Sequence, residues 1–301
     1  MIAFVLSGGG ARGALEVGAL QALVEANIRA DMIVGTSAGA INAAGFATNP
    51  TTAGVERLAG QWIHAPSGDI FPGNWFTIAR RFLTRQDSLY PNDGLRRFIE
   101  ACLPPGVNTF GDITQIRLYT TAANLNTSTL YLFGEDPKAR LVDAVLASSA
   151  IPPIFPPVEH NGYQYVDGGV VANVPISVAV GQGATTVYAI NLGDSGEMSD
   201  PARGIIPIAQ QTIFTLMYQQ LLDDLADVVQ MPHITLYNIV IAAFQGHPIR
   251  DLSQSAAMIA EGYRATREYL SRPPITPVLP LGPPRAPAPP PPGARIWRLK
   301  R

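Results

Sequence analysis

Residues 3–26 read AFVLSGGGARGALEVGALQALVEA, and this stretch indicates the fold. The apolar run of residues 3–7 is typical of a short buried strand, and it leads into the glycine-rich loop of residues 8–13. Apolar residues then recur at helical spacing from residue 14 to residue 26. A strand, a glycine loop and a helix in this order are typical of α/β proteins with parallel strands.

The same order repeats in the next residues. A second apolar run, residues 31–34, ends at Gly35, and residues 38–47 are small and apolar, as in a helix packed closely on a sheet. Connections between parallel strands are almost always right-handed, and open α/β sheets bind ligands at the carboxyl ends of their strands. The glycine loop and the turn after Gly35 are therefore predicted to face each other.

The rest of the chain continues the alternation and then changes character. We expect strands in residues 115–125, 128–133, 162–166, 186–192 and 234–241, and helices in residues 141–147, 205–229 and 254–270. From Arg272 the chain is rich in Pro and Ala, with six basic and no acidic residues, and this composition cannot bury enough apolar surface to fold. We expect one folded domain over residues 1–271 and a disordered tail over 272–301, which is either functionless or a basic membrane tether.

Composition narrows the class of protein. Apolar residues make up 47% and charged residues 15%, and the formal net charge is -2, so nucleic acid is not an expected partner. The single cysteine excludes an internal disulfide and suits a reducing compartment. We find no signal peptide and no uninterrupted apolar stretch long enough to span a bilayer. The expected location is the cytoplasm, and peripheral contact with a membrane is left open.

A serine turn is the first element that carries chemistry. Gly35-Thr36-Ser37-Ala38-Gly39 fits the G-x-S-x-G pattern between a predicted strand and a predicted helix, which is the context that this motif requires. Ser37 would then stand at a helix amino terminus, where the helix dipole favours developing negative charge. The alternative is a serine that only caps the helix.

The glycine loop is the second element. Backbone N–H groups of such a loop form an anion-binding concavity, which in acyl transfer would be an oxyanion hole. Arg12 adds positive charge or braces the loop. Gly8, Gly10 and Gly13 also match G-x-G-x-x-G, with Asp31 as a ribose ligand by position, so nucleotide binding is a further alternative.

The third element is Asp167-Gly168-Gly169, which by itself could be a plain turn after a strand. An ordinary catalytic triad would also need a histidine base. Only His233 and His247 follow Asp167, as the chain order serine, aspartate, histidine demands, and neither lies in a recognisable catalytic context.

Together these elements resemble the patatin-like phospholipase family. The glycine block of residues 8–13, the serine turn of residues 35–39 and the D-G-G of residues 167–169 occur in the family's order, and residues 147–152, ASSAIP, resemble its further serine-rich block. The resemblance covers roughly residues 2–270.

The resemblance implies a three-layer α/β/α sandwich with a mostly parallel central sheet. It also implies a Ser-Asp dyad in which Ser37 is the nucleophile and Asp167 the base. Gly8, Gly9, Gly10 and Arg12 would form the oxyanion hole, supported by the motif glycines. These motif glycines are Gly13, Gly35, Gly39, Gly168 and Gly169.

The activity implied is hydrolysis of carboxylic esters of the phospholipase A, lysophospholipase or esterase type, with a lipid or acyl ester as substrate and without metal or cofactor. An acyltransferase built on the same serine turn is the alternative. Residues 61–84 interleave aromatic, apolar and basic side chains, so they form either a cap that touches lipid or part of the core.

Overall fold

The apolar runs predicted as strands form a mixed, mostly parallel sheet in the computed structural model, which describes residues 1–73, 75–193 and 201–272. Among these residues, eight strands follow the order β5-β6-β3-β2-β1-β7-β8, and β4 pairs with β3. The strands are β1 (Ile2–Leu6), β2 (Met32–Gly35), β3 (Arg117–Asn124), β4 (Thr129–Phe133), β5 (Val158–His160), β6 (Tyr163–Asp167), β7 (Thr186–Asn191) and β8 (Thr235–Val240).

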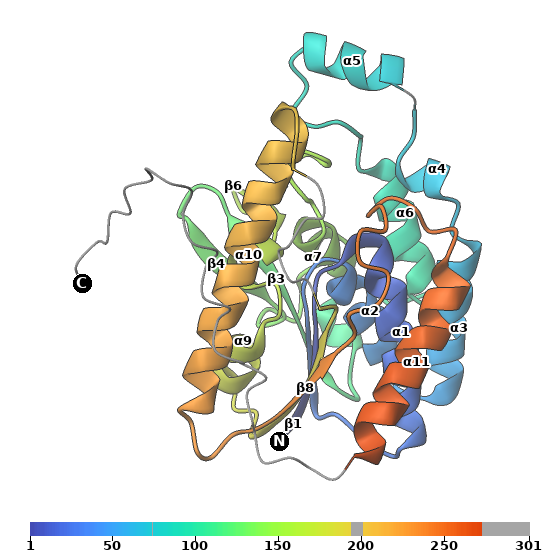
Figure 1. Cartoon of the computed structure of the whole chain (residues 1–301), viewed down its shortest axis with the longest axis vertical. Coiled ribbons are helices and arrows are strands. Elements are labelled where there is room, and N and C mark those ends of the chain that lie inside the picture. The colour runs from blue at the N-terminus through green and yellow to red at the C-terminus, as the bar shows by residue number, and fades with distance from the viewer. Residues whose placement is uncertain (74, 194–200, 273–301) are drawn as a thin grey trace, which may run out of the picture.

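Helices cover both faces of this sheet (Figure 1). Successive residues of β1 point to opposite faces, so Phe4 and Leu6 join one core cluster while Ala3 and Val5 join another. The first cluster includes α1 (Gly13–Glu25), α2 (Ala38–Ala47), α3 (Thr52–His64), α6 (Asp93–Cys102), α7 (Leu141–Ser148) and α11 (Ser255–Ser271). The second includes α9 (Ile176–Gly181) and α10 (Ile205–Val229). The predicted three-layer α/β/α sandwich is thus confirmed.

Two strands end side by side on one edge of β3. The last pair between parallel strands β2 and β3 joins Gly35 to Thr120, and the last pair between antiparallel strands β6 and β3 joins Asp167 to Ala122. β4 occupies the other edge of β3 at these positions, so β2 and β6 must share the remaining edge. Their ends are therefore two residues apart along β3, and the turn after Gly35 lies beside Asp167.

The predicted elements agree with the observed ones to within a few residues. Several further elements were not predicted, among them the helices α3, α6 and α9 and the short strand β5. No described helix is both long and apolar enough to cross a membrane. Residues 273–301 of the predicted tail lie outside the described residues, so the domain boundary after residue 271 stays a prediction.

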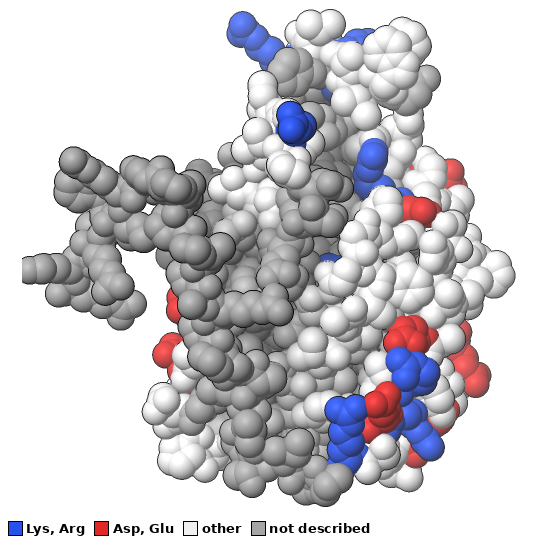
Figure 2. Space-filling view, in the orientation of Figure 1, with Lys and Arg blue, Asp and Glu red and all other residues white. Residues whose placement is uncertain are grey.

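Charge is distributed unevenly along the molecule (Figure 2). At the lower end of α11, arginines and glutamates alternate in ion pairs, in which Arg264 contacts Glu261 and Glu268, and Glu268 also contacts Arg272. At the opposite tip of the molecule, the charged side chains that the view shows are basic.

Candidate active site

Ser37 lies in a sharp turn between β2 and α2 whose backbone is strained. Its φ of 56° and ψ of −123° are rare for a residue with a side chain and are typical of a functional strand-to-helix turn. A Cβ on Gly35 would lie 2.3 Å from the carbonyl oxygen of Gly39, and a Cβ on Gly39 would lie 2.5 Å from that of Leu6. The turn therefore requires glycine at both positions.

Two neighbouring serines hold the backbone of Ser37. The N–H of Ser37 donates to Oγ of Ser148 at 3.0 Å, and the hydroxyl of Ser149 donates to the carbonyl oxygen of Ser37 at 3.1 Å. Both serines belong to the ASSAIP segment. This segment thus fixes the strained turn from the side, a role that sequence reasoning did not assign to it.

The carboxyl group of Asp167 is buried beside Ser37, with only 3% of the residue exposed. The N–H of Gly169 donates to its Oδ1 at 2.8 Å. Burial raises the pKa of Asp167 to about 7, against hydrogen bonds from the Ser37 side chain and from Gly169 that lower it. Oδ2 has no hydrogen-bond partner among the described residues, so this oxygen is available to accept a proton.

The glycine loop presents two N–H groups that lack an acceptor. The N–H of Gly8 donates to the carbonyl oxygen of Asn173 at 3.1 Å, and the N–H of Arg12 donates to that of Gly9 at 3.2 Å. Within the described part of the chain, no acceptor meets the N–H of Gly9 or Gly10. Of the four residues predicted to form an oxyanion hole, Gly9 and Gly10 have free donors in this conformation, whereas those of Gly8 and Arg12 are engaged.

The side chains of Arg12 and Asn173 brace this loop. The buried guanidinium of Arg12 donates to the carbonyl oxygen of Leu192 at 3.1 Å, which agrees with the bracing role considered for it. The side-chain oxygen of Asn173 is buried and without a partner among the described residues, and it would lie 2.5 Å from a Cβ on Gly8. Sequence reasoning missed Asn173, although a polar residue on the turn after D-G-G could have drawn attention to it.

The other motif glycines also lie so close to neighbouring atoms that an added Cβ would clash with them. Their nearest neighbours are Ala38 for Gly13, Thr121 for Gly168 and Met217 for Gly169.

A buried polar network runs beneath the glycine loop to the wall of the pocket. The hydroxyl of Ser7 and the side-chain amide of Asn42 donate to the carboxyl group of Glu16, at 3.4 Å and 2.9 Å. Nε1 of Trp62 donates in turn to the carbonyl oxygen of the Asn42 side chain at 2.7 Å. Glu16 is fully buried, and this burial raises its pKa to about 8. Sequence reasoning did not single out Glu16, because its helix is apolar on the remaining faces.

This buried carboxyl group makes folding stability depend on pH. The folded protein keeps the Glu16 proton up to about pH 8, whereas the unfolded chain releases it near the ordinary value of 4.5. The free energy of unfolding therefore falls as the pH rises through this window, and Asp167 acts in the same direction up to about pH 7. We expect Glu16→Gln to flatten the decline of Tm between about pH 5 and pH 8, measured by differential scanning fluorimetry. An identical decline in Glu16→Gln and in the exposed-site control Glu159→Gln would contradict this assignment.

An apolar pocket adjoins Ser37. Its walls come from Trp62, from Ile70 and Phe71 of the α4 region (α4, Ser67–Ile70), and from Ile154 and Phe155. The cavity volume is about 50 Å³. The pocket is therefore narrow in this conformation.

The segment before α11 forms the wall of this pocket next to the glycine loop. Ile249 and Leu252 line the pocket. The carbonyl oxygen of Ile249 accepts the N–H of Ala11 at 2.9 Å, and the N–H of Leu252 donates to Oγ of Ser67 at 3.0 Å. These two hydrogen bonds tie the segment to the glycine loop and to α4.

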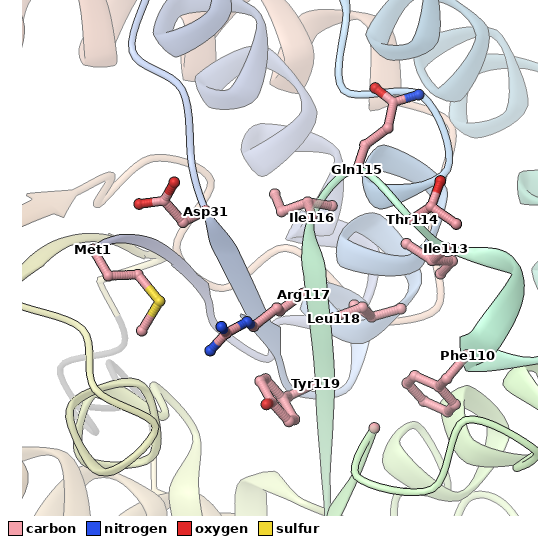
Figure 3. Close-up of a pocket in the computed structure, with 11 residues that line it drawn as sticks. Met1, Asp31, Phe110, Ile113, Thr114, Gln115, Ile116, Arg117, Leu118 and Tyr119 are labelled. Carbon is pink, nitrogen blue, oxygen red and sulfur yellow. The ribbon is translucent and has the colours of Figure 1, made fainter.

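A larger cavity, of about 630 Å³, lies where β2 and β3 begin. Figure 3 shows Met1, Asp31 and Arg117 on one side of it and Phe110 on the other. It contains neither Ser37 nor Asp167, and open α/β sheets bind ligands at the opposite, carboxyl ends of their strands. We therefore place the candidate site at the smaller pocket.

The placement of Asp31 removes the support for nucleotide binding. Asp31 precedes β2, and its Oδ2 accepts the N–H of Ile2 at 2.8 Å. It thus lies at the amino ends of the strands, whereas the glycine loop follows the carboxyl end of β1. A ribose ligand would have to lie on the same side of the sheet as the glycine loop.

Neither a histidine nor a metal-binding group accompanies Ser37 among the described residues. His64 contacts the carbonyl oxygen of Gly60, and His247 contacts that of Asp251. Among the described residues, no histidine forms a hydrogen bond with Ser37 or Asp167. In the same part of the chain, no three His, Cys, Asp or Glu side chains are grouped so as to hold a metal ion.

Comparison with known proteins finds one family and several relatives. The family model described as patatin-like phospholipase matches residues 4–180. Patatin-like phospholipase domain-containing protein 6 of Homo sapiens is 30% identical over 212 residues, which are 65% of this chain and 14% of that protein. Lysophospholipase NTE1 of Saccharomyces cerevisiae is 28% identical over 209 residues, which are 65% of this chain and 11% of that protein. The chain thus spans only a small part of these relatives.

Among solved structures, VipD from Legionella pneumophila aligns with 89% of this chain and 66% of its own, at 16% identity and a TM-score of 0.46.

Proposed function

This chain belongs to the patatin-like phospholipase family, and from that premise we propose that it hydrolyses carboxylic esters of lipids with Ser37 as nucleophile and Asp167 as base. One observation supports this proposal above all others. A serine on a strained strand-to-helix turn and a buried carboxyl group lie within reach of each other, next to free N–H groups of a glycine loop.

In the first step, Asp167 takes the hydroxyl proton of Ser37 while Oγ attacks the carbonyl carbon of the ester. An exposed carboxylate is a weak base toward a serine hydroxyl, but burial raises the pKa of Asp167 to about 7 and improves it as a proton acceptor. The N–H of Gly169 holds Oδ1, which leaves Oδ2 to receive the proton.

The negative charge that develops on the ester oxygen needs donors that are already in place. We assign this role to the N–H groups of Gly9 and Gly10, because both lack an acceptor, and to the positive end of the α2 dipole at Ser37. The engaged N–H groups of Gly8 and Arg12 hold the loop in shape.

Collapse of the tetrahedral intermediate completes the first half-reaction. The alcohol leaves with the proton held by Asp167, and the acyl group stays on Oγ of Ser37. Water then attacks the acyl-enzyme, with Asp167 again as base, and releases the fatty acid. No histidine and no metal takes part in this scheme.

The pH dependence of turnover tests the identity of the base. Asp167 must be ionised to act, so we expect kcat/KM for p-nitrophenyl butyrate to rise as the pH passes through about 7 and to level off above it. Assays between about pH 5 and pH 9, each quenched at one alkaline pH, measure this profile. Because Glu16 also titrates near this range, the same midpoint in Glu16→Gln would assign it to Asp167. A profile that is flat, or that falls over this range, would contradict the base assignment.

The apolar pocket beside Ser37 is the proposed acyl site, and its small volume limits chain length. The ring of Phe71 stacks on Phe155 with centroids 5.4 Å apart and lies on the pocket wall. We expect Phe71→Ala to raise kcat/KM for decanoyl relative to butyryl p-nitrophenyl esters by at least about tenfold, since even one further methylene bound in an apolar site contributes about that much. The matched control is Phe76→Ala, which removes an exposed ring outside the pocket. An equal shift in both variants would remove the pocket from the proposal.

A further inference from the structure

Two helices project from the end of the molecule that carries Ser37. Figure 1 shows α5 (Trp75–Leu83) and the amino-terminal end of α10 at the same end of the long axis, beyond the sheet. Ser37 lies at the carboxyl ends of the parallel strands. Helix α5 lies near the same end because it follows α4, whose Ile70 lines the pocket beside Ser37. A membrane or partner molecule that contacts this end of the protein would therefore lie close to the proposed acyl site.

These two helices expose large apolar side chains to solvent. On α5 the exposed fractions are 67% for Trp75, 63% for Phe76 and 80% for Leu83, and on α10 they are 85% for Ile205 and 51% for Ile208. The rings of Trp75 and Phe76 stack on each other. Other residues of the same segment are in the core, since Trp62 and Ile70 are buried. The structure thus places part of residues 61–84 in the core and leaves another part exposed to solvent, while contact with lipid stays a prediction.

The charges next to the exposed side chains of α5 are mainly basic. Residues 70–86 contain Arg80, Arg81 and Arg85 and no acidic residue, and Asp69 and Asp87 flank this range. The guanidinium of Arg81 is held by Ser88, whereas the side chains of Arg80 and Arg85 form no hydrogen bond or ion pair with another described residue. Basic side chains therefore show at the tip in Figure 2.

The amino-terminal part of helix α10 is uncharged. Its residues 205–222 carry no charge, and in the sequence they are preceded by Arg203 and, before it, by Asp200. The acidic residues 223, 224 and 227 of the helix lie in its carboxyl-terminal part. An exposed apolar surface with neighbouring arginines is typical of helices that lie in the interface of an anionic bilayer.

We propose that α5 and the amino-terminal half of α10 form a docking surface for an anionic lipid bilayer. This inference rests on the proposed function, since it makes the bilayer the source of the substrate. The aromatic and aliphatic side chains of the surface enter the boundary between head groups and acyl chains, and Arg80 and Arg85 contact the lipid phosphates. A second copy of the chain fits this surface less well, because a two-fold contact would bring the arginines of both copies together.

Vesicle cosedimentation of the full chain tests the docking surface. Wild type is expected to bind vesicles of phosphatidylcholine with phosphatidylserine more tightly than vesicles of phosphatidylcholine alone. The triple variant Trp75→Ser/Phe76→Ser/Leu83→Ser should lose at least about tenfold in partitioning. Arg80→Gln/Arg85→Gln should lose about fivefold for each arginine on the anionic vesicles only. The matched control Arg264→Gln/Arg267→Gln, on α11, should bind as wild type does.

Activity on a soluble ester separates this proposal from the proposed function. All surface variants should hydrolyse p-nitrophenyl butyrate at the wild-type rate, which also shows that they fold, whereas Ser37→Ala should bind vesicles normally without hydrolysis. Wild-type binding by the triple variant would overturn the docking surface, as would failure of the wild type to bind anionic vesicles. Binding lost only on deletion of residues 273–301 would place the contact in the tail, and a dimer broken by the triple variant would assign the surface to a second copy.

Discussion

Asp167→Asn is expected to lower kcat for p-nitrophenyl butyrate by about 10³- to 10⁴-fold, which corresponds to about 4–5.5 kcal/mol of transition-state stabilisation. The amide keeps the oxygen that accepts the N–H of Gly169 but cannot take the proton of Ser37. Stopped-flow or endpoint kinetics at about pH 8 measure this loss, since wild-type Asp167 is largely ionised there.

The fold should survive this substitution. Above its pKa of about 7, Asp167 is a buried carboxylate, which lowers the stability of the folded wild type. The uncharged amide removes this cost, so Tm at about pH 8 should be unchanged or higher in the variant. The matched control is Asp224→Asn, because Asp224 is also buried and its pKa is also raised, but it bonds Ser177 at 3.0 Å and not Ser37. If Asp167→Asn keeps more than about a tenth of the activity, Asp167 is not the base.

Ser37→Ala is expected to lower kcat by about 10⁴-fold or more, and to abolish labelling by a fluorophosphonate, because the variant lacks the oxygen that forms the acyl-enzyme. The matched control is Ser149→Ala. Ser149 is also buried and lines the same pocket, but its hydroxyl is engaged with the carbonyl oxygen of Ser37. We expect this variant to lose at most about tenfold in kcat and to remain labelled. The opposite pattern, with activity lost in Ser149→Ala and kept in Ser37→Ala, would assign the nucleophile to Ser149.

The elements around the site could be predicted because their signals are local. Parallel strands buried on both faces appear in the sequence as short apolar runs. The backbones at Gly35 and Gly39 approach so closely that a side chain does not fit, and the sequence therefore has glycine at both positions. The turn and the glycine loop were therefore recognisable from residues 3–47 alone. Their position on one side of the sheet followed from the handedness of the connections.

The position of Asp167 beside Ser37 depends on a non-local pairing. It requires β6 to pair antiparallel with the end of β3, on the same edge that β2 occupies nearer the start of β3. The residues of β6 do not indicate in the sequence that β3 is their partner. The resemblance to a family supplied the pairing of Ser37 with Asp167, and the register now gives it a geometric reason.

Other features could not be predicted because they depend on which surfaces are covered. The raised pKa of Glu16 follows from complete burial, which a single acidic residue in an apolar helix does not reveal. Likewise, Trp62 and Trp75 belong to one aromatic segment, yet the first is buried and the second exposed. The free N–H groups of Gly9 and Gly10 depend on the carbonyl groups that reach the loop from Asn173 and Ile249.

Mapping a fluorophosphonate adduct by peptide mass spectrometry, as a function of pH, is the most direct measurement of whether Ser37 and Asp167 act as a pair. Wild type should carry a single adduct on Ser37, formed at a rate that rises as the pH passes through about 7, and Asp167→Asn should form it at least about 100-fold more slowly. An adduct on another residue would contradict the nucleophile, and an unchanged labelling rate in Asp167→Asn would contradict the dyad.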